Sequence, residues 1–88
     1  MAKKLAQAQD LIWKRIGDDV VVIKDGGLTT HVLNKSAAYI WELCDGNNGI
    51  DEIAAKIHER YEVTYKEALA DVDSTIKLLT KASIIKYS

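Results

Sequence analysis

The chain has 88 residues, a mass of 9.8 kDa, a net charge of −1 and a pI of about 6.1. This length fits one domain, residues 1–88, and 48% hydrophobic with 28% charged residues is typical of globular proteins rather than disordered ones. The near-neutral charge removes the simple electrostatic case for binding nucleic acid. No run of about 18 apolar residues and no signal peptide is present, so we expect no membrane segment and a cytoplasmic protein.

The first third of the chain has the pattern of strands. Residues 1–10 are mixed and polar, and we expect them to be frayed or to form a short helical start. Three runs rich in apolar or β-branched residues follow, at 12–16, 20–23 and 28–33. Asp25-Gly26-Gly27 supplies the positive φ of a tight hairpin between the last two. The pattern predicts an antiparallel meander with 20–23 as its central strand.

After residue 33 the period of the apolar residues changes from two, which is typical of strands, to 3.6, which is typical of helices. Asn34 is a good N-cap for a first helix, which we expect to end at Gly46 as a left-handed cap. A second helix begins near Gly49. Thr64 and Glu67 form a capping box that opens a long third helix.

The third helix is expected to stop near Ser83, before a short apolar tail at 84–87. The fold class predicted from this order is α+β, a three-stranded antiparallel β-meander followed by three helices, which is winged helix-turn-helix-like. Helices must cover one face of so small a sheet, so we expect one core within residues 12–87. Its predicted members are Trp13, Val22, Ile40, Trp41, Ile53, Ile57, Val72, Ile76 and Leu79.

Residues able to carry chemistry are few and scattered. Cys44 is the only cysteine, and its spacing places it on the buried stripe of the first helix, where a thiol behaves as a small apolar group. His31 and His58 belong to no cluster with the spacing of metal ligands. We therefore expect no catalytic residues, no metal, no cofactor and no enzymatic activity.

A winged-helix DNA-binding regulator is the alternative from another class. Residues 36–63 contain two basic and six acidic side chains, giving 2 − 6 = −4, and residues 64–88 contain four lysines and three acids, giving +1. Strong duplex binding neutralises roughly 6–10 phosphates, and the expected helices lack that charge.

The run at 28–33 is the most informative feature. It contains no charged residue and no proline, whereas the run at 12–16 has Lys14 and Arg15 in its middle. Sheet edges are usually protected by such residues, so an uncharged edge offers its backbone to an added strand. The alternative is that residues 1–10 or 84–87 cover this edge.

Several motifs resemble the PqqD family. They begin with Leu33-Asn34, followed by small residues, the Ile40-Trp41 pair and the closing Asp45-Gly46. The resemblance spans roughly residues 12–87. Its later parts are Ile50-Asp51-Glu52-Ile53, Arg60-Tyr61, Asp71-Val72, Thr75-Ile76 and Leu79.

This resemblance implies a RiPP recognition element, a domain that binds the leader of a ribosomally made precursor peptide. In that family the leader adds as an extra strand to the third strand, in a groove toward the third helix, and is presented to a modifying enzyme. In the namesake pathway, pyrroloquinoline quinone biosynthesis, the enzyme is of the radical SAM/SPASM type. Other relatives serve lasso-peptide or other RiPP pathways.

The peptide-binding residues predicted on this basis lie on two elements. The backbone ladder is assigned to Leu28, Thr29, Thr30, His31, Val32 and Leu33, and the opposite wall to Asp71, Thr75 and Leu78. Strand parity stays open, because the set Leu28, Thr30 and Val32 is nearly as apolar as the set Thr29, His31 and Leu33.

Overall fold

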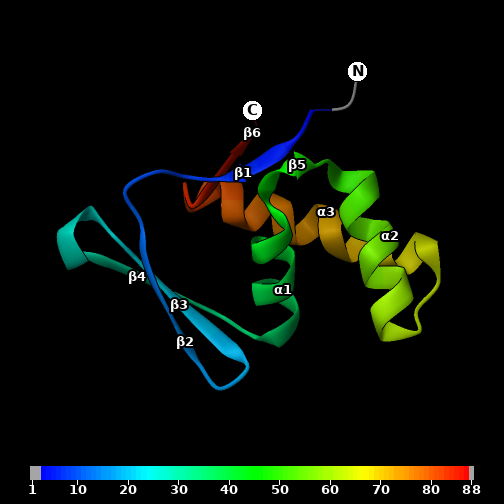
Figure 1. Ribbon diagram of the computed structural model, residues 1–88, viewed down its shortest axis with the longest axis horizontal. Coiled ribbons are helices and arrows are strands. Elements are labelled where there is room, and N and C mark those ends of the chain that lie inside the picture. The colour runs from blue at the N-terminus through cyan, green and yellow to red at the C-terminus, as the bar shows by residue number, and fades with distance from the viewer. Residues whose placement is uncertain (1–2, 88) are drawn as a thin grey trace.

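The computed structural model describes residues 3–87 and contains two small antiparallel sheets and three helices (Figure 1). The α+β class and the winged helix-turn-helix-like arrangement predicted from the sequence are confirmed. In chain order the elements are β1 (Leu5–Gln7), β2 (Ile12–Ile16), β3 (Asp19–Lys24), a 3₁₀ turn (Asp25–Gly27), β4 (Thr29–Leu33), α1 (Lys35–Leu43), β5 (Asp45–Asn48), α2 (Ile50–Tyr61), α3 (Tyr65–Lys81) and β6 (Ile85–Tyr87).

The predicted meander is present as the sheet β2-β3-β4, with β3 in the centre. Val22 of β3 pairs with Trp13 on one side and with His31 on the other. Gly26 and Gly27 have φ values of 66° and 97° in the turn before β4, a conformation that glycine adopts without steric cost. The hairpin between β3 and β4 therefore depends on these two glycines.

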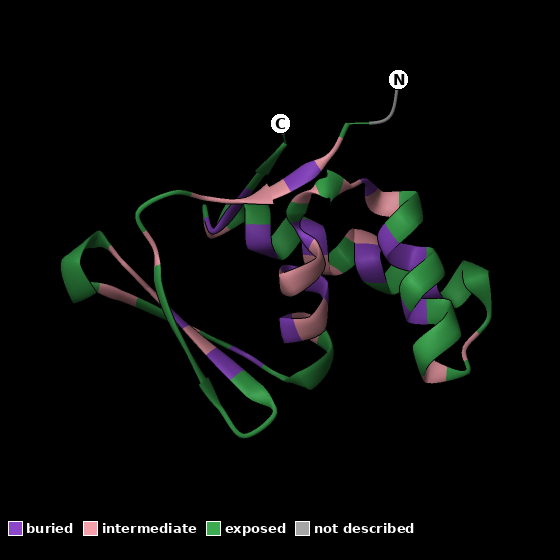
Figure 2. Ribbon diagram, in the orientation of Figure 1, coloured by how far each residue is buried: buried purple, intermediate pink, exposed green. Residues whose placement is uncertain are grey.

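Each helix buries one face in a shared core, α1 against the meander and α2 and α3 against α1 and each other (Figure 2). α1 contacts β3, β4, α2 and α3, so it stands between the meander and the other helices. The Asn34 side chain caps α1 by accepting from the Ala37 amide at 3.0 Å. No helix within residues 3–87 combines the length and apolar character that crossing a bilayer requires.

The predicted end of the first helix at Gly46 is wrong, because α1 stops at Leu43. The Asn48 side-chain amide donates to the Leu43 carbonyl at 2.9 Å, which satisfies one of the carbonyls left free at the helix end. Gly46 does have a positive φ of 90°, but it lies in β5. The positive φ therefore serves this short strand, which the sequence analysis missed.

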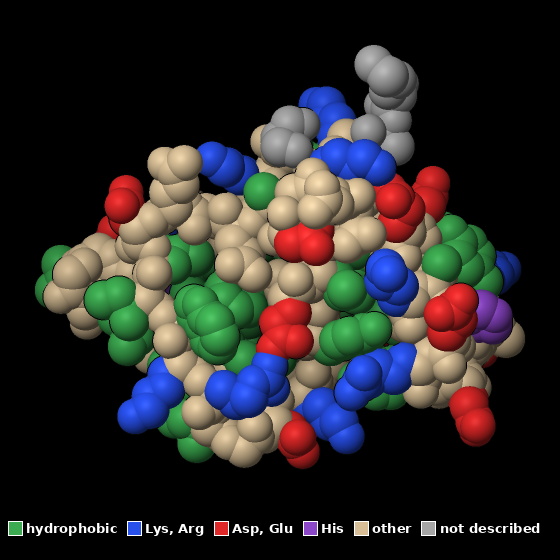
Figure 3. Space-filling view, viewed as in Figure 1, with side chains coloured by type: hydrophobic (Ala, Val, Ile, Leu, Met, Phe, Trp, Pro, Cys, Tyr) green, Lys and Arg blue, Asp and Glu red, His purple; other side chains and the backbone are tan. Residues whose placement is uncertain are grey.

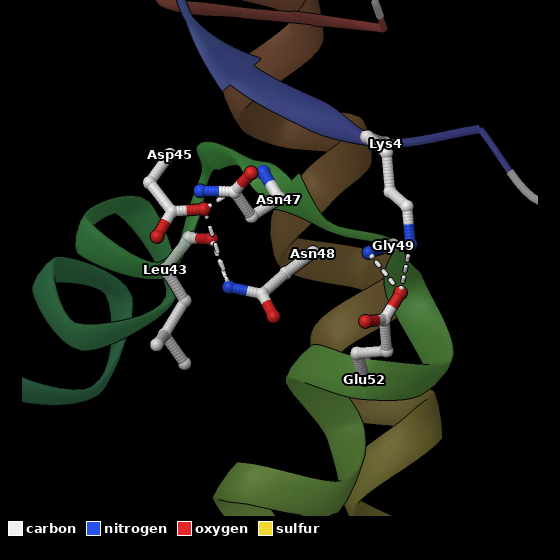
Figure 4. A network of polar contacts seen from close by, with 7 residues as sticks. All are labelled: Lys4, Leu43, Asp45, Asn47, Asn48, Gly49 and Glu52. Atoms are coloured by element: carbon white, nitrogen blue, oxygen red, sulfur yellow. Dashed lines mark hydrogen bonds and ion pairs between the residues drawn. The ribbon is translucent and has the colours of Figure 1, made fainter.

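The expectation that residues 1–10 are frayed or helical is wrong over the described part, and residues 1–2 lie outside it. β1 pairs with β5 on one side and β6 on the other, and Leu5 is 0% exposed. Figure 4 shows the corner beside this strand, where the Lys4 ammonium lies 2.6 Å from the Glu52 carboxylate. The same Glu52 oxygen accepts from the Gly49 amide at 3.0 Å, so the N-terminal segment is tied to the start of α2.

The C-terminal tail reaches β1 through a sharp turn at Ser83. Ser83 has a φ of 63°, its amide donates to the Thr80 carbonyl at 2.9 Å, and the Ile84 amide donates to the Leu79 carbonyl at 3.1 Å. These two bonds form the Schellman motif that ends many helices, here with serine where glycine is usual. The turn places Ile84 and Ile85 in the core.

The core contains eight of the nine predicted residues, and Trp13 is the exception. Trp13 is 49% exposed, although its ring meets that of Trp41 edge-to-face with centroids 5.5 Å apart. β2 lies at the edge of the sheet, where only part of the ring is covered. The aromatic contact is therefore made at the rim of the core.

Replacing Leu5 with alanine is expected to lower the free energy of unfolding by about 2–4 kcal/mol, because the leucine fills a fully buried site. Urea unfolding measures the change. Gln9→Ala, at an exposed position nearby, is the matched control and should have little effect. A Leu5→Ala protein as stable as the original would contradict the packing of β1 against the core.

Candidate functional site

The edge of β4 is available for pairing. β3 pairs with one side of β4, and no strand within residues 3–87 pairs with the other. The alternative interpretation placed residues 1–10 or 84–87 over this edge, but the strands within these segments, residues 5–7 and 85–87, pair with each other instead. The described chain therefore leaves the outward amides and carbonyls of β4 without strand partners, as the sequence analysis expected of its third strand.

The structure resolves which side chains of β4 face the helices. His31 and Leu33 pair with Val22 and Val20, both 0% exposed, so they share the inward face of the sheet with Thr29. Val32 is 67% exposed on the outward face. Of the two parities left open by the sequence, the set Thr29, His31 and Leu33 points toward the helices.

A cleft of about 440 Å³ lies between β4 and α3. It brings three predicted residues of the strand together with Thr75 and Leu78 of the helix, and its lining contains no Asp, Glu, Lys or Arg. Leu78 is 68% exposed, so it belongs to the cleft wall rather than to the core. The lining residues are His31, Val32, Leu33, Asn34, Ser36, Ala37, Thr75, Leu78, Leu79, Ala82 and Ile84.

A second cleft of about 450 Å³ continues the first along α3. The two share Ser36 and Thr75, so they form one groove that passes the start of α1. Among residues 3–87, Asp71 is the only charged side chain in the lining of either cleft. Asp71, Thr75 and Leu78 have the i, i+4, i+7 spacing that puts residues on one helix face. The second cleft is lined by Ser36, Ile40, Ile57, Tyr61, Val63, Asp71, Ser74 and Thr75.

Three predicted residues lie outside both clefts. Leu28 belongs to the turn before β4 and is 89% exposed, so the strand begins one residue later than predicted. The Thr29 hydroxyl donates to the Asp25 carboxylate at 3.3 Å, and Thr30 is exposed. Thr29 and Thr30 are in the ladder of β4 but line neither cleft.

Other lining residues were not predicted as site residues. Asn34, Ser36 and Ala37 come from the start of α1, and Leu79, Ala82 and Ile84 come from the end of α3 and the turn that follows. The expected N-cap at Asn34 could have suggested the first group, because it places a helix start directly after the free strand. No local signal indicates the second group, since the turn at Ser83 brings it there.

A lysine fixes the position of α3 relative to the sheet. The Lys24 ammonium, at the end of β3, donates to the Ala82 carbonyl at 3.2 Å. A cation at the C-terminus of a helix is favoured by the helix dipole. This contact links the sheet to the C-terminal end of α3, at the Ala82 end of the groove.

The groups with reactive chemistry lie in ordinary structural surroundings. Cys44 is 0% exposed, its thiol donates to the Ile40 carbonyl at 3.3 Å, and burial, with the negative charge of Asp45, raises its pKa to about 12. The predicted core role of Cys44 is confirmed. The Nε2 atom of His31 is buried with no hydrogen-bond partner in the described chain. Within residues 3–87, no three His, Cys, Asp or Glu side chains gather as a metal site.

These features define a class of protein, namely an α+β domain with a free sheet edge beside a groove. The sequence matches the family described as Coenzyme PQQ synthesis protein D (PqqD) over residues 19–85, and the chain belongs to this family. The search of curated proteins finds no significant match.

Two solved structures share the fold. A structure of TbiB1 in complex with the TbiA(beta) leader peptide has a TM-score of 0.81 and 21% identity, with 92% of this chain and 94% of that chain covered. A structure of the heterocyclase TruD has a TM-score of 0.69 and 14% identity, with 98% of this chain but only 12% of that chain covered. At these identities the likeness concerns the fold.

The Cys44 thiol is expected to resist thiol reagents in the native protein at about pH 8, because both its burial and its raised pKa leave very little thiolate. Reaction with a chromogenic disulfide reagent, followed with and without denaturant, measures this. The unfolded chain should react rapidly and the folded chain only as fast as it opens. Rapid modification of the folded protein would show that the thiol is accessible.

Proposed function

We propose that this protein is a non-catalytic adaptor that binds the leader of a ribosomally made precursor peptide by strand addition to β4. The observation that carries the proposal is the unpaired edge of β4, within the described chain, beside a groove whose other wall is α3. Membership of the PqqD family and the fold shared with TbiB1, whose structure contains a leader peptide, support it.

Strand addition divides the work between backbone and side chains. Main-chain hydrogen bonds to β4 give affinity for any extended peptide, and pockets for alternate side chains give selectivity. Inward side chains of the leader would contact Leu33, Leu78 and Leu79, which line the groove. Such binding gives affinities of roughly micromolar, about −8 kcal/mol, so the modified product can leave.

The adaptor role explains how binding serves a reaction carried out elsewhere. Holding the leader while touching the enzyme converts the encounter of enzyme and substrate into a nearly intramolecular one. We propose a partner of the radical SAM/SPASM type in a pathway like that of pyrroloquinoline quinone, acting in the cytoplasm. A lasso-peptide or other RiPP pathway is the alternative, and the fold shared with part of the heterocyclase TruD supports an association with modifying enzymes.

The charge distribution favours a peptide over duplex DNA. The segment 36–63 has a net charge of −4, and the described groove lining contains no lysine or arginine. On the face shown in Figure 3, Lys and Arg side chains are interspersed with Asp and Glu rather than gathered in one field. Neutralising the phosphates of a DNA backbone requires Lys and Arg side chains gathered on one surface.

Titration with the leader of a precursor gene encoded nearby is expected to shift amide NMR signals in residues 29–33 and along the groove side of α3. Leu78→Glu should weaken binding at least tenfold, because it puts a charge into the apolar part of the groove. Thr80→Glu is the matched control, since Thr80 is exposed on the same helix but lines neither described cleft.

Three results would count against strand addition. If a scrambled leader of the same composition bound equally well, recognition would not depend on the order of side chains along the peptide. Leader binding that left residues 29–33 unshifted would place the site elsewhere. Tight binding to duplex DNA with no response to any leader would favour a regulator.

A further inference from the structure

We propose that the groove selects a leader segment with an arginine two or four residues from its apolar anchor, and that Asp71 of this chain pairs with that arginine. This inference rests on the proposed function and specifies the chemistry of the peptide. It follows from the way charge is distributed along the groove, which differs between its two ends.

One end of the groove is anionic. Asp71 is the single charged residue in the combined lining of the two clefts, it is exposed, and it has no ion-pair partner among residues 3–87. Asp73 lies two residues later on α3. Unlike Asp71, it has an ion-pair partner, Lys77 at 3.0 Å, and it lines neither cleft. Within the described part of the chain, the carboxylate of Asp71 is thus the one acid in the lining that a peptide in the groove could pair with.

A cation lies beside the other end of the groove, although it is not part of the lining. The Lys24 ammonium donates to the Ala82 carbonyl there, and Ala82 lines the first cleft. A basic residue of the peptide would be repelled at this end and attracted at the Asp71 end. The opposite charges therefore favour one placement of a basic residue.

Arginine fits the Asp71 end better than lysine does. The second cleft contains, besides the carboxylate, the hydroxyls of Ser36 and Ser74, and the Tyr61 hydroxyl is buried beside it without a hydrogen-bond partner in the described chain. A guanidinium has five N–H donors in a planar fork, whereas an ammonium has three on one point. Several acceptors spread around one cavity match the wider donor group.

The spacing follows from the helix. Asp71 and Leu78 are seven residues apart on α3, which is about 10.5 Å at a rise of 1.5 Å per residue. An extended peptide covers this length in about three residues at roughly 3.3 Å each. Alternate side chains of an extended strand point to opposite faces, so two that both enter the groove are separated by an even number of positions. The arginine should therefore lie two or four positions from the side chain that fills the space between Leu33 and Leu78, on the side that reaches the start of α1.

Selection from a display library of random twelve-residue peptides tests the proposal without knowledge of the natural precursor. The wild-type protein should enrich peptides in which an arginine lies two or four positions from an apolar residue. With Asp71→Asn the arginine preference should disappear while the apolar preference remains, and Asp73→Asn should behave as wild type. For one selected peptide, Asp71→Asn should cost about three- to fivefold in affinity, the size expected for a partly exposed ion pair.

A reversed charge gives a second measurement. Asp71→Lys should exchange the preference for arginine for one for glutamate at the same position, and all preferences for charge should weaken in high salt. Circular dichroism checks that the variants fold. Because Asp71 is exposed on the long helix α3, its replacement should leave the core unchanged.

The outcomes separate the two proposals. Enriched peptides that shift residues 29–33 but have no arginine preference, or keep it on Asp71→Asn, would overturn the role of Asp71 and leave strand addition intact. A library that yields no peptide shifting residues 29–33 would overturn strand addition, and the role of Asp71 with it.

Discussion

The structure depends on where the two ends of the described chain are paired. β1 and β6 pair with each other and, through β1, with β5, so neither is available to β4. A three-stranded meander then keeps one edge with Lys14 and Arg15 and a second edge that contains no charge. Because the unpaired edge lies against the groove formed with α3, one topological choice produces both halves of the candidate site.

Packing keeps this arrangement rigid enough to select a ligand. Leu5, Ile84 and Ile85 belong to the same core as Trp41 and Ile76, so the terminal strands are held by burial and not only by their few hydrogen bonds. The Lys24 contact to the end of α3 fixes the helix wall relative to the sheet. A preformed groove loses less conformational entropy on binding than a flexible one, which helps a small domain to bind an extended peptide.

The sequence predicted the elements with a clear residue pattern and missed those without one. The meander was indicated by runs of apolar and β-branched residues and α3 by a 3.6-residue period, and both are present as expected. β5 has the sequence Asp45-Gly46-Asn47-Asn48, which has poor strand propensity and becomes a strand only because β1 lies beside it. Trp13 was expected in the core although the sequence already placed its strand at an edge of the meander, where a large ring is only partly covered. Parity on β4 was undecidable from the sequence, since both faces contain apolar residues and only the pairing with Val20 and Val22 separates them.

Amide hydrogen exchange along β4 tests the central claim most directly. In an edge strand every second amide points away from its neighbour, so alternate residues within 29–33 should exchange fast in the free protein. The account predicts that a bound leader protects these amides, while the outward amides of β2, at the opposite edge of the same sheet, keep their rates. Fast exchange on β4 that persists in the saturated complex would contradict it, because the peptide would then be bound without becoming the fourth strand.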